Sequence, residues 1–446
     1  MSMTIKNNIS AMRILNIMGQ HSRALAKNMQ RISSGSRINS AADDPSGYAI
    51  SQRMRIQIRS LDQASQNAQK GMNMLKVAEG AVTSTVDILK TLKEKVLNAA
   101  NGTNTTADRR TIQKELDQAI DQINDNANVT FNGKTLVDGS MNKTIRAATT
   151  NVYTNQNLST ASVASSALTA LRDRDGNLLD IKSSDTVKVS FVQNGRTFTT
   201  SYAVGSTSLA SIFANATAAA GTAGYGFAAA PQTGSFIGVD ATGVSVYTAD
   251  GTTALSIAAA SAGTTGQISG FSISISGTDG NVKKSINQKL DAFSETIRAQ
   301  NVSGNHALSL QIGTKSNQSI MVGLTDMRAQ ALGLQGTDPV TGNVKNLNVT
   351  TQEGASAAIN AIDNAIQKAL DGQTDIGAVE SRLENTVNNL TTASENLTAA
   401  ESTISDTDMA REITEYTKNS ILMQAAQAML AQANHSTFSV LSLLQP

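Results

Sequence analysis

The chain has 446 residues, a formal net charge of +1, three His, no Trp and no Cys. A charge this close to zero gives no general attraction to nucleic acid or to acidic substrates, and the lack of Cys excludes a disulfide framework and any thiolate metal or redox site. Aromatic residues make up only 3% of the chain, so a core must come from Leu, Ile, Val, Met and Ala spread over many contacts. This composition favours long helical seams.

The N-terminal zone, residues 1–139, carries a coiled-coil pattern. Between Met54 and Val96 the sequence alternates steps of four and three residues without a break, and most of the positions reached are apolar. These positions are Met54, Ile58, Leu61, Ser65, Ala68, Met72, Leu75, Glu79, Val82, Val86, Leu89, Lys93 and Val96. A sustained 3.5-residue period is typical of a left-handed coiled-coil seam and predicts one long helix.

A second helix is predicted in the same zone. Asn101-Gly102 breaks the first helix, and Thr105 with Asp108 offers a capping box for the next. That second helix carries apolar residues through Ala127 and gives way to a turn at Asn132-Gly133.

The C-terminal zone, from about residue 350, mirrors the first. Thr350 and Glu353 suggest another capping box, ahead of a helix whose apolar residues recur every seven positions. The recurring residues are Ile376, Leu383, Leu390, Leu397 and Ile404. The two zones together predict a mostly α fold, with long antiparallel coiled-coil helices from both termini.

The composition and alternation of the middle zone, from about Ser140 to Gly313, predict an inserted β-rich domain. It is rich in Ser, Thr, Gly and Ala, and it alternates apolar and polar residues on both sides of Asn194-Gly195, which is a hairpin pattern. Residues 244–247 and 271–275 alternate in the same way. We expect a short helix near residues 287–300.

The outermost segments predict an assembly interface. An isolated helix with one apolar stripe is marginal in water, so exposed stripes at both ends of one chain require partners. The apolar residues assigned to this interface are Ile5, Ile9, Met12, Leu15, Leu25, Met29, Ile32, Ile404, Met409, Ile413, Ile421, Leu422, Met429, Leu430, Phe438, Leu441 and Leu444. A subunit whose two ends both require partners is typical of a repeating lattice. When a heterologous contact between subunits does not close into a ring, it produces a helical filament.

Other candidate sites are weaker. Asp43-Asp44 precedes Pro45 and predicts a turn or helix cap more than an acid–base pair. The three His are far apart without a metal-binding motif, so we expect no metal and no cofactor. The six basic residues before Asp43 predict a solvated face or contacts to the acidic stretch 401–415, and no binding to nucleic acid. The N-terminus lacks the apolar core of a secretory signal peptide. The sequence contains no run of 18 apolar residues, so we expect no membrane insertion.

Several of these segments resemble the bacterial flagellin family. The run NMQRISSGSRINSAADDPSGYAIS (Asn28–Ser51) is similar to the family's Leu-Ser-Ser-Gly-x-Arg-Ile-Asn-Ser-Ala-x-Asp-Asp pattern, and residues 63–81 resemble the block that follows. Residues 131–134 resemble its Phe-Asn-Gly turn, and residues 310–313 resemble its Leu-Gln-Ile-Gly strand. The segment from Ala400 to Leu444 resembles the flagellin C-terminus.

The resemblance implies a domain plan, a function and partners. Residues 1–45 and 405–446 would form the inner tube of a flagellar filament, residues 46–139 and 308–404 the outer tube with a short β element, and residues 140–307 the exposed variable domain. Copies would form a helical homopolymer for motility, secreted by type III export and extracellular. The expected partners are a secretion chaperone, a cap protein and junction proteins.

The resemblance also bears on a host receptor. Many flagellins are detected by a Toll-like innate-immune receptor through a Leu-Gln-Arg-Val-Arg-Glu-Leu pattern. The chain retains Leu89, Lys93 and Glu94 of this pattern, with Lys in place of the second Arg, and Thr91 replaces the first Arg. Because Lys cannot reproduce a bidentate Arg contact, we expect weak recognition.

Two other functions fit parts of the sequence. A hook–filament junction protein would share the flagellin termini, and a surface adhesin or host-receptor ligand would use the β-rich middle zone. Polymer formation by pure protein distinguishes the first, and deletion of residues 140–307 tests the second. No constellation of residues predicts an enzyme.

Overall fold

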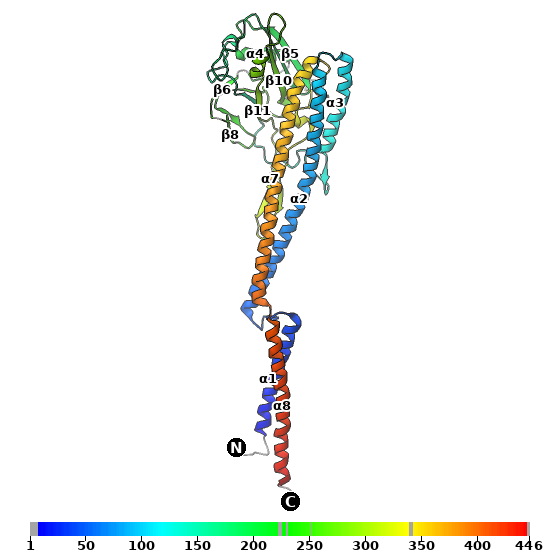
Figure 1. Ribbon diagram of the computed structural model, residues 1–446, viewed down its shortest axis with the longest axis vertical. Helices are drawn as coiled ribbons and strands as arrows, with labels where there is room; N and C mark the ends of the chain where they lie inside the picture. The colour runs from blue at the N-terminus through cyan, green and yellow to red at the C-terminus, as the bar shows by residue number, and fades with distance from the viewer. Residues whose placement is uncertain (1–7, 222–224, 229–230, 250, 339–341, 444–446) are drawn as a thin grey trace. The chain divides into compact units, whose positions relative to one another are not determined.

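The computed structural model describes residues 8–221, 225–228, 231–249, 251–338 and 342–443, with side chains as far as His435. Its contacts divide the chain into two compact units (Figure 1). The first unit comprises residues 1–68, 311–318 and 385–446, and the second comprises residues 69–310 and 319–384. Each unit is described by itself.

The helices and strands follow the chain in an order that places the β structure between two helical zones. The helices are α1 (Ile9–Ser34), α2 (Pro45–Ala100), α3 (Thr106–Ala127), α4 (Leu209–Ala220), α5 (Lys284–Leu290), α6 (Ala329–Leu332), α7 (Gln352–Ser405) and α8 (Met409–Leu443). The strands are β1 (Thr130–Phe131), β2 (Lys134–Thr135), β3 (Val152–Asn155), β4 (Thr186–Gln193), β5 (Arg196–Ala203), β6 (Gln232–Gly234), β7 (Phe236–Val239), β8 (Ser245–Tyr247), β9 (Ala254–Ala258), β10 (Ile268–Ser276), β11 (Phe293–Ile297), β12 (Leu308–Gln311), β13 (Ser319–Val322), β14 (Gln335–Thr337) and β15 (Val344–Asn346). The mostly α fold with an inserted β-rich region is confirmed.

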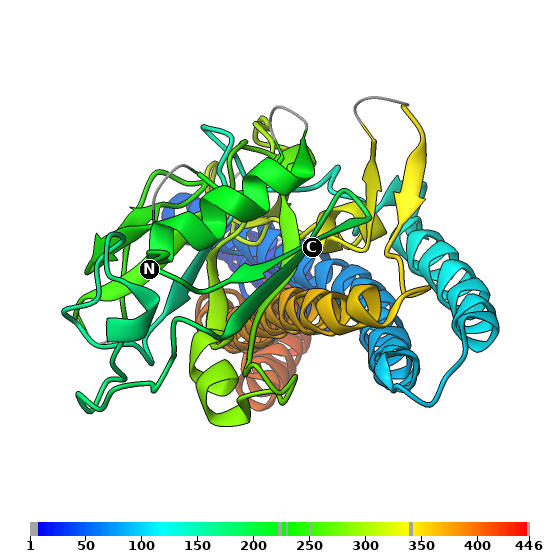
Figure 2. The ribbon, with the colours of Figure 1, turned by 90° about the horizontal axis from the view of Figure 1, so that it is seen from above.

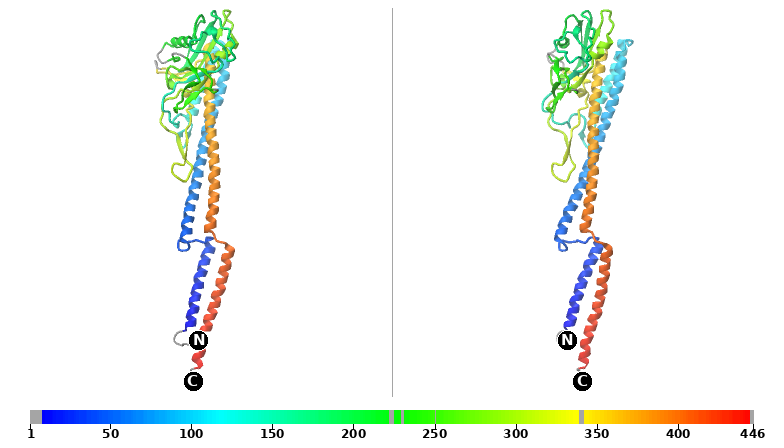
Figure 3. Two further views of the ribbon diagram at one scale, coloured as in Figure 1. Left: turned by 90° about the vertical axis from the view of Figure 1, so that its left-hand side faces the viewer. Right: turned by 60° about the vertical axis from the view of Figure 1, so that its left-hand side comes forward.

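The predicted seams of α2 and α7 face inward. Each of the thirteen seam positions predicted between Met54 and Val96 is buried or half-buried, and so are the heptad positions from Ile376 to Ile404. In the second unit the two helices lie side by side and antiparallel (Figure 3). Lys93 Nζ lies 2.5 Å from Asp363 Oδ1, and ten residues back along α2 Thr83 accepts a 3.2 Å bond from Gln373. A step along one helix is therefore matched by an equal step back along the other.

Of the two predicted capping boxes, the one at α3 is confirmed and the one at α7 is wrong. Thr105 and Asp108 form the predicted capping box of α3. At α7 the predicted cap Thr350 bonds the side chain of Asn348 instead, and Thr351 Oγ1 accepts the 3.0 Å bond from the Gly354 N–H. The N-cap is therefore Thr351, one residue later than expected, because Asn348 competes for the hydroxyl of Thr350, and Gly354 has no side chain to complete a capping box.

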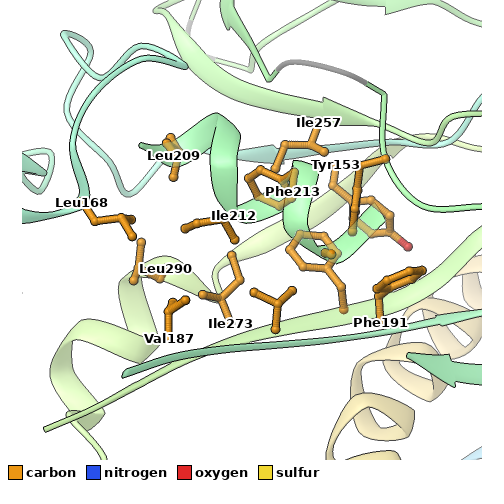
Figure 4. Packing of buried hydrophobic residues seen from close by; sticks show 14 of the residues in the cluster. Tyr153, Leu168, Val187, Phe191, Leu209, Ile212, Phe213, Ile257, Ile273 and Leu290 are labelled. Carbon is orange, nitrogen blue, oxygen red and sulfur yellow. The ribbon is translucent and has the colours of Figure 1, made fainter. Parts of the chain in front are cut away.

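The middle domain builds its own core between short sheets. Strands β10, β4 and β5 form one antiparallel sheet, and strands β11, β3, β9 and β6 form another. The predicted hairpin is confirmed, since Gln193 pairs with Arg196 around Asn194-Gly195, both of which have positive φ. Figure 4 shows Ile212 and Phe213 of α4 packed among sheet residues that include Ile273 and Phe191.

The helix expected near residues 287–300 is wrong in its extent. Helix α5 occupies residues 284–290, and the chain then continues as strand β11. The alternation of Phe293, Glu295 and Ile297 fits a strand, and this strand pairs with β3. Pairing to a distant strand overrides the local helical pattern here.

Helix α7 also serves the middle domain, because β10 packs directly on it (Figure 2). A Cβ built at Gly270 would lie 2.5 Å from the backbone nitrogen of Ala361, so this close approach requires glycine. The ammonium of Lys368 lies 3.2 Å from Glu295 Oε2, and these side chains are only 7% and 6% exposed. Arg298 pairs with Asp371 one turn further on. These contacts fix the middle domain to α7.

In the first unit, a short joint connects α1 to α2 and α7 to α8. Gly35 ends α1 with a φ of 69°. The Arg37 N–H donates to the Ser405 carbonyl at 2.6 Å, the Arg37 guanidinium donates to the Ile404 carbonyl at 2.6 Å, and the Thr407 N–H donates to the Gly35 carbonyl at 3.0 Å. The two connections are thus bonded to each other through their backbones.

The adjacent carboxylates at Asp43 and Asp44 are structural, as predicted. Asp43 accepts bonds from the backbone of Asn39 and Ser40, and Asp44 accepts bonds from Ser46 and Gly47 at the start of α2. The Lys27 ammonium, 2.8 Å from Asp43, lowers the pKa of that carboxyl from 3.8 to about 2. The turn therefore depends on a charged Asp43.

We predict that acid loosens this joint. A depressed pKa stabilises the fold above the unfolded value of 3.8, and this stabilisation is lost as the pH falls through about 2. Hydrogen exchange over residues 36–44, corrected for intrinsic rates, should show more frequent opening across this range. In Asp43→Asn the opening should be largely independent of pH, and an unchanged pH dependence would contradict the role given to Asp43.

We also predict a pH effect of opposite sign in the middle domain. Burial raises the pKa of Asp291 from 3.8 to about 6, so the protonated carboxyl stabilises the fold at low pH and that stabilisation is lost as the pH rises through about 6. Asp291→Asn should gain up to about 3 kcal/mol in unfolding free energy relative to the wild type between about pH 4 and about pH 7. Paired urea titrations measure this difference, and a constant difference would disprove the assignment.

Candidate assembly surface

Helices α1 and α8 pair antiparallel in the first unit. The Asn8 amide donates to the Ala433 carbonyl at 3.2 Å, His21 Nδ1 lies 3.2 Å from Asn419 Oδ1, and Arg31 lies 3.7 Å from Glu412. The start of α1 thus lies beside the C-terminal part of α8, and the end of α1 lies beside the start of α8 (Figure 1). This arrangement brings the N- and C-terminal segments of the chain together.

The residues between the two helices follow a heptad of their own. On both helices they recur in steps of three and four, and every one is buried or half-buried. These seam residues are Ala11, Ile14, Met18, His21, Leu25, Asn28 and Ile32 of α1, and Glu412, Tyr416, Asn419, Met423, Ala426, Leu430 and Ala433 of α8. The seam is thin, because Ala and polar residues occupy many of its positions.

Polar side chains cross the middle of this seam. In the orientation that satisfies its neighbours, the Asn28 amide donates to Glu412 Oε1 at 3.2 Å and to the Ala24 carbonyl at 2.9 Å, and its oxygen accepts from Asn419 at 3.3 Å. Asn419 in turn meets His21. Polar residues at coiled-coil seam positions fix the register at a cost in stability. The pair is therefore specific and only weakly stabilised by its own seam.

Most of the predicted interface residues point away from the seam. Ile9, Met12 and Met29 of α1 are 53–60% exposed, and Ile421 and Met429 of α8 are 59% and 61% exposed. Leu15, Met409, Ile413 and Leu422 are also exposed, whereas Leu25, Ile32, Ile404 and Leu430 are half-buried. Ile5, Phe438, Leu441 and Leu444 lie outside the residues whose side chains the structure describes. The two helices together leave an outward apolar surface uncovered within one copy.

The polar seam was missed by the sequence reasoning. His21 and Asn28 were not among the interface residues, because apolar periodicity passes over polar side chains. The steps of three and four from Ala11 to Ile32 are present in the sequence and would have identified the inner face. Apolar residues are spread around α1 on more than one face, so their pattern alone does not single out the face that carries these polar side chains.

Charge complementarity joins the two terminal zones. The expected contact between the basic N-terminal segment and the acidic stretch 401–415 is confirmed at Arg31 with Glu412. Further along α2, Arg55 pairs with Glu401 at 2.8 Å, and the Ser51 hydroxyl donates to the same carboxylate at 2.6 Å. Burial alone would raise the pKa of Glu401, but the bonds from Ser51 and Arg55 outweigh burial and lower this pKa. The carboxylate is therefore a charged link between α2 and α7.

The candidate receptor patch is only partly accessible. Leu89 is completely buried in the seam of α2, so it cannot contact a partner of the folded chain. Lys93 is half-buried and paired with Asp363, and Glu94 is exposed. Of the three residues, Glu94 is therefore the one whose side chain is exposed and has no ion pair or hydrogen bond among the described contacts.

Among the described residues, no group of three or more His, Cys, Asp or Glu side chains is arranged to hold a metal ion. Among the described helices, none combines the length and apolar character needed to cross a membrane.

Comparisons with known proteins agree with the geometry of the terminal helices. Residues 5–142 match the bacterial flagellin N-terminal helical region, and residues 359–444 match the bacterial flagellin C-terminal helical region. A flagellin from Clostridium tyrobutyricum is 35% identical over 98% of this chain and all of that protein, and one from Bacillus subtilis is 30% identical over 99% of this chain and all of that protein.

The chain is also weakly similar to a solved junction protein. A solved flagellar junction protein from Legionella pneumophila, FlgL, is 17% identical over 75% of this chain and 99% of that chain, with a TM-score of 0.29. The flagellin matches extend over nearly the full length of the chain at 30–35% identity. The chain belongs to the bacterial flagellin family and is a subunit of the flagellar filament.

Proposed function

We propose that the outward apolar faces of α1 and α8 are the surface through which copies of this chain polymerise. The observation that carries the proposal is the exposure of Met12, Met29, Ile421 and Met429 on a helix pair whose own seam is thin. Burying such side chains against a neighbour stabilises an assembly by about 1.5–3 kcal/mol each. One copy cannot cover its own outward surface, so several copies must.

The proposal assigns the chain to three concentric parts of a filament. Residues 1–45 and 405–446 form the inner tube, residues 46–139 and 308–404 form the outer tube, and residues 140–307 are displayed outside. The assignment is supported by the thin seam of α1 with α8, compared with the long and mostly apolar seam of α2 and its contacts to α7. Packing of β10 on α7 makes the middle domain an integral part of the outer-tube helices rather than a loosely tethered insertion.

The role is structural and not catalytic, and it is carried out outside the cell after secretion through the flagellar type III export apparatus. A secretion chaperone that covers α8 before assembly, and a cap protein at the growing tip, fit the apolar exposure of that helix. Recognition by a Toll-like receptor would be weak, because Leu89 is buried and Lys93 is engaged by Asp363. Glu94 is the residue of that patch that remains accessible.

Substitution of exposed apolar residues should weaken polymerisation without unfolding the subunit. Met12→Ser combined with Met429→Ser removes two large side chains that are 60% and 61% exposed in one copy. The critical concentration, measured by sedimentation of polymer, should rise by at least about tenfold. Gln20→Ser, at an exposed polar position of α1, is the matched control and should polymerise normally. Normal assembly of the double variant would rule out this surface.

Deletion of residues 419–446 should abolish polymerisation, because it removes most of α8 and five of the seven residues that α8 contributes to the α1–α8 seam. The second unit should retain its thermal transition, since none of its residues is removed. Electron microscopy and calorimetry of the truncated chain measure both results. Filaments of normal appearance from this truncation would contradict the proposed function.

A further inference from the structure

Strand β10 has one edge that no other strand of the described residues covers. It is the outermost strand of the sheet β10–β4–β5, and on its other edge it has only a bridge from Ser276 to Val282 and a 3.0 Å backbone bond from the Lys283 N–H to the Ile275 carbonyl, both at its end. An uncovered edge presents unpaired N–H and carbonyl groups and is a template for pairing with another chain. Whether another chain can pair with β10 therefore depends on which groups already bond this edge.

Two amides of α7 cover the first half of the edge. Asn364 Nδ2 donates to the Ser269 carbonyl at 2.8 Å, and one turn earlier Asn360 Nδ2 donates to the Phe271 carbonyl at 2.8 Å. Both Asn side chains lie on one face of the helix, because they are four residues apart. They bond alternate residues of the strand, which are the ones that face the free edge.

The segment around α5 covers the second half. The Ile273 N–H donates to Asp291 Oδ1 at 3.0 Å, and the Ile275 N–H donates to Asn287 Oδ1 at 2.7 Å. The alternation therefore continues from residue 269 to residue 275. Side chains therefore bond each edge-facing residue from Ser269 to Ile275, and the backbone of Lys283 adds a bond to the Ile275 carbonyl at the end of the edge.

The sequence of β10 explains why an open edge would be hazardous. Its nine residues, ISGFSISIS, contain no charge and no Pro, and apolar and polar side chains alternate from Phe271 to Ser276. Short uncharged segments of high β propensity without Pro are prone to intermolecular strand pairing. Antiparallel pairing of two copies of this segment would place Ser and Ile opposite similar residues, so the fitting partner is β10 of a second chain.

The cover is held firmly in place. Gly270 brings β10 against the backbone of Ala361, between the two Asn positions. The buried pair of Lys368 with Glu295 and the pair of Asp371 with Arg298 continue the contact further along α7. Strand and helix are therefore fixed at the distance at which the Asn amides reach the carbonyls.

We propose that Asn360 and Asn364 of α7, together with Asn287 and Asp291 near α5, mask the free edge of β10 and prevent its antiparallel pairing with β10 of a second copy. The masking leaves the terminal helices as the surface that directs association. It is independent of how those helices assemble, since every residue involved belongs to the second unit.

The test removes the two amides of α7 in the full-length, unpolymerised chain. Asn360→Ala with Asn364→Ala keeps helix propensity and leaves the Ser269 and Phe271 carbonyls open. Sedimentation velocity should detect association at a concentration about tenfold lower than for the wild type. Hydrogen exchange should show that association protects residues 268–276 and leaves α1 and α8 unchanged. The same state of association as the wild type, or protection confined to α1 and α8, would overturn the proposal.

A matched control and a second probe complete the experiment. Asn388→Ala with Asn389→Ala removes two exposed amides of the same helix and should behave as the wild type. A fluorescent peptide with the sequence of residues 268–276 should bind the Asn360/Asn364 variant at least about tenfold more tightly than the wild type, as measured by anisotropy. Circular dichroism verifies that the variant is folded. Equal peptide binding by both folded chains would also overturn the proposal.

Discussion

The antiparallel pairing of N-terminal with C-terminal helices is the constraint on which the rest of the structure depends. It brings α1 to α8 through a seam that is polar from its middle, at His21 and Asn419, to its joint end, at Asn28 and Glu412, and it brings α2 to α7 through a mostly apolar seam. The two seams have opposite consequences. The apolar one supports a helix pair within one copy, whereas the thin polar one fixes a register but leaves large apolar side chains such as Met12 and Met429 in solvent. A filament subunit needs both properties.

Helix α7 connects the helical scaffold to the middle domain because different faces of it serve different partners. One face carries the seam towards α2, with Ile376 and Leu383 buried. Another bonds the middle domain through Asn360, Asn364 and Lys368. The absence of a side chain at Gly270 makes the double contact possible, since it allows the strand to reach the backbone of α7 at Ala361. The inserted domain is therefore held by packing and not only by its two chain connections.

The sequence predicted the helices, cap and hairpin that local periodic patterns specify. It did not predict the features that depend on contacts between segments far apart in the chain. The seams of α2 and α7, the cap at Thr105 and the hairpin around Asn194-Gly195 are local patterns, and each is confirmed. The helix expected over residues 287–300 was wrong, because β11 is specified by its pairing with β3. The polar seam and the bonds from α7 to β10 escaped prediction for a related reason. An Asn amide that bonds a carbonyl about ninety residues away leaves no periodic signal in the chain.

The central claim is that the terminal helices are stable only when neighbouring copies cover their outward apolar faces. Hydrogen exchange of α1 and α8, compared between dilute subunits and assembled polymer, tests it most directly. The account predicts rapid exchange in both helices of the dilute subunit, strong protection in the polymer, and little difference in the buried part of α2 between Leu75 and Val96. Strong protection of α1 and α8 in the dilute, solitary subunit would contradict it.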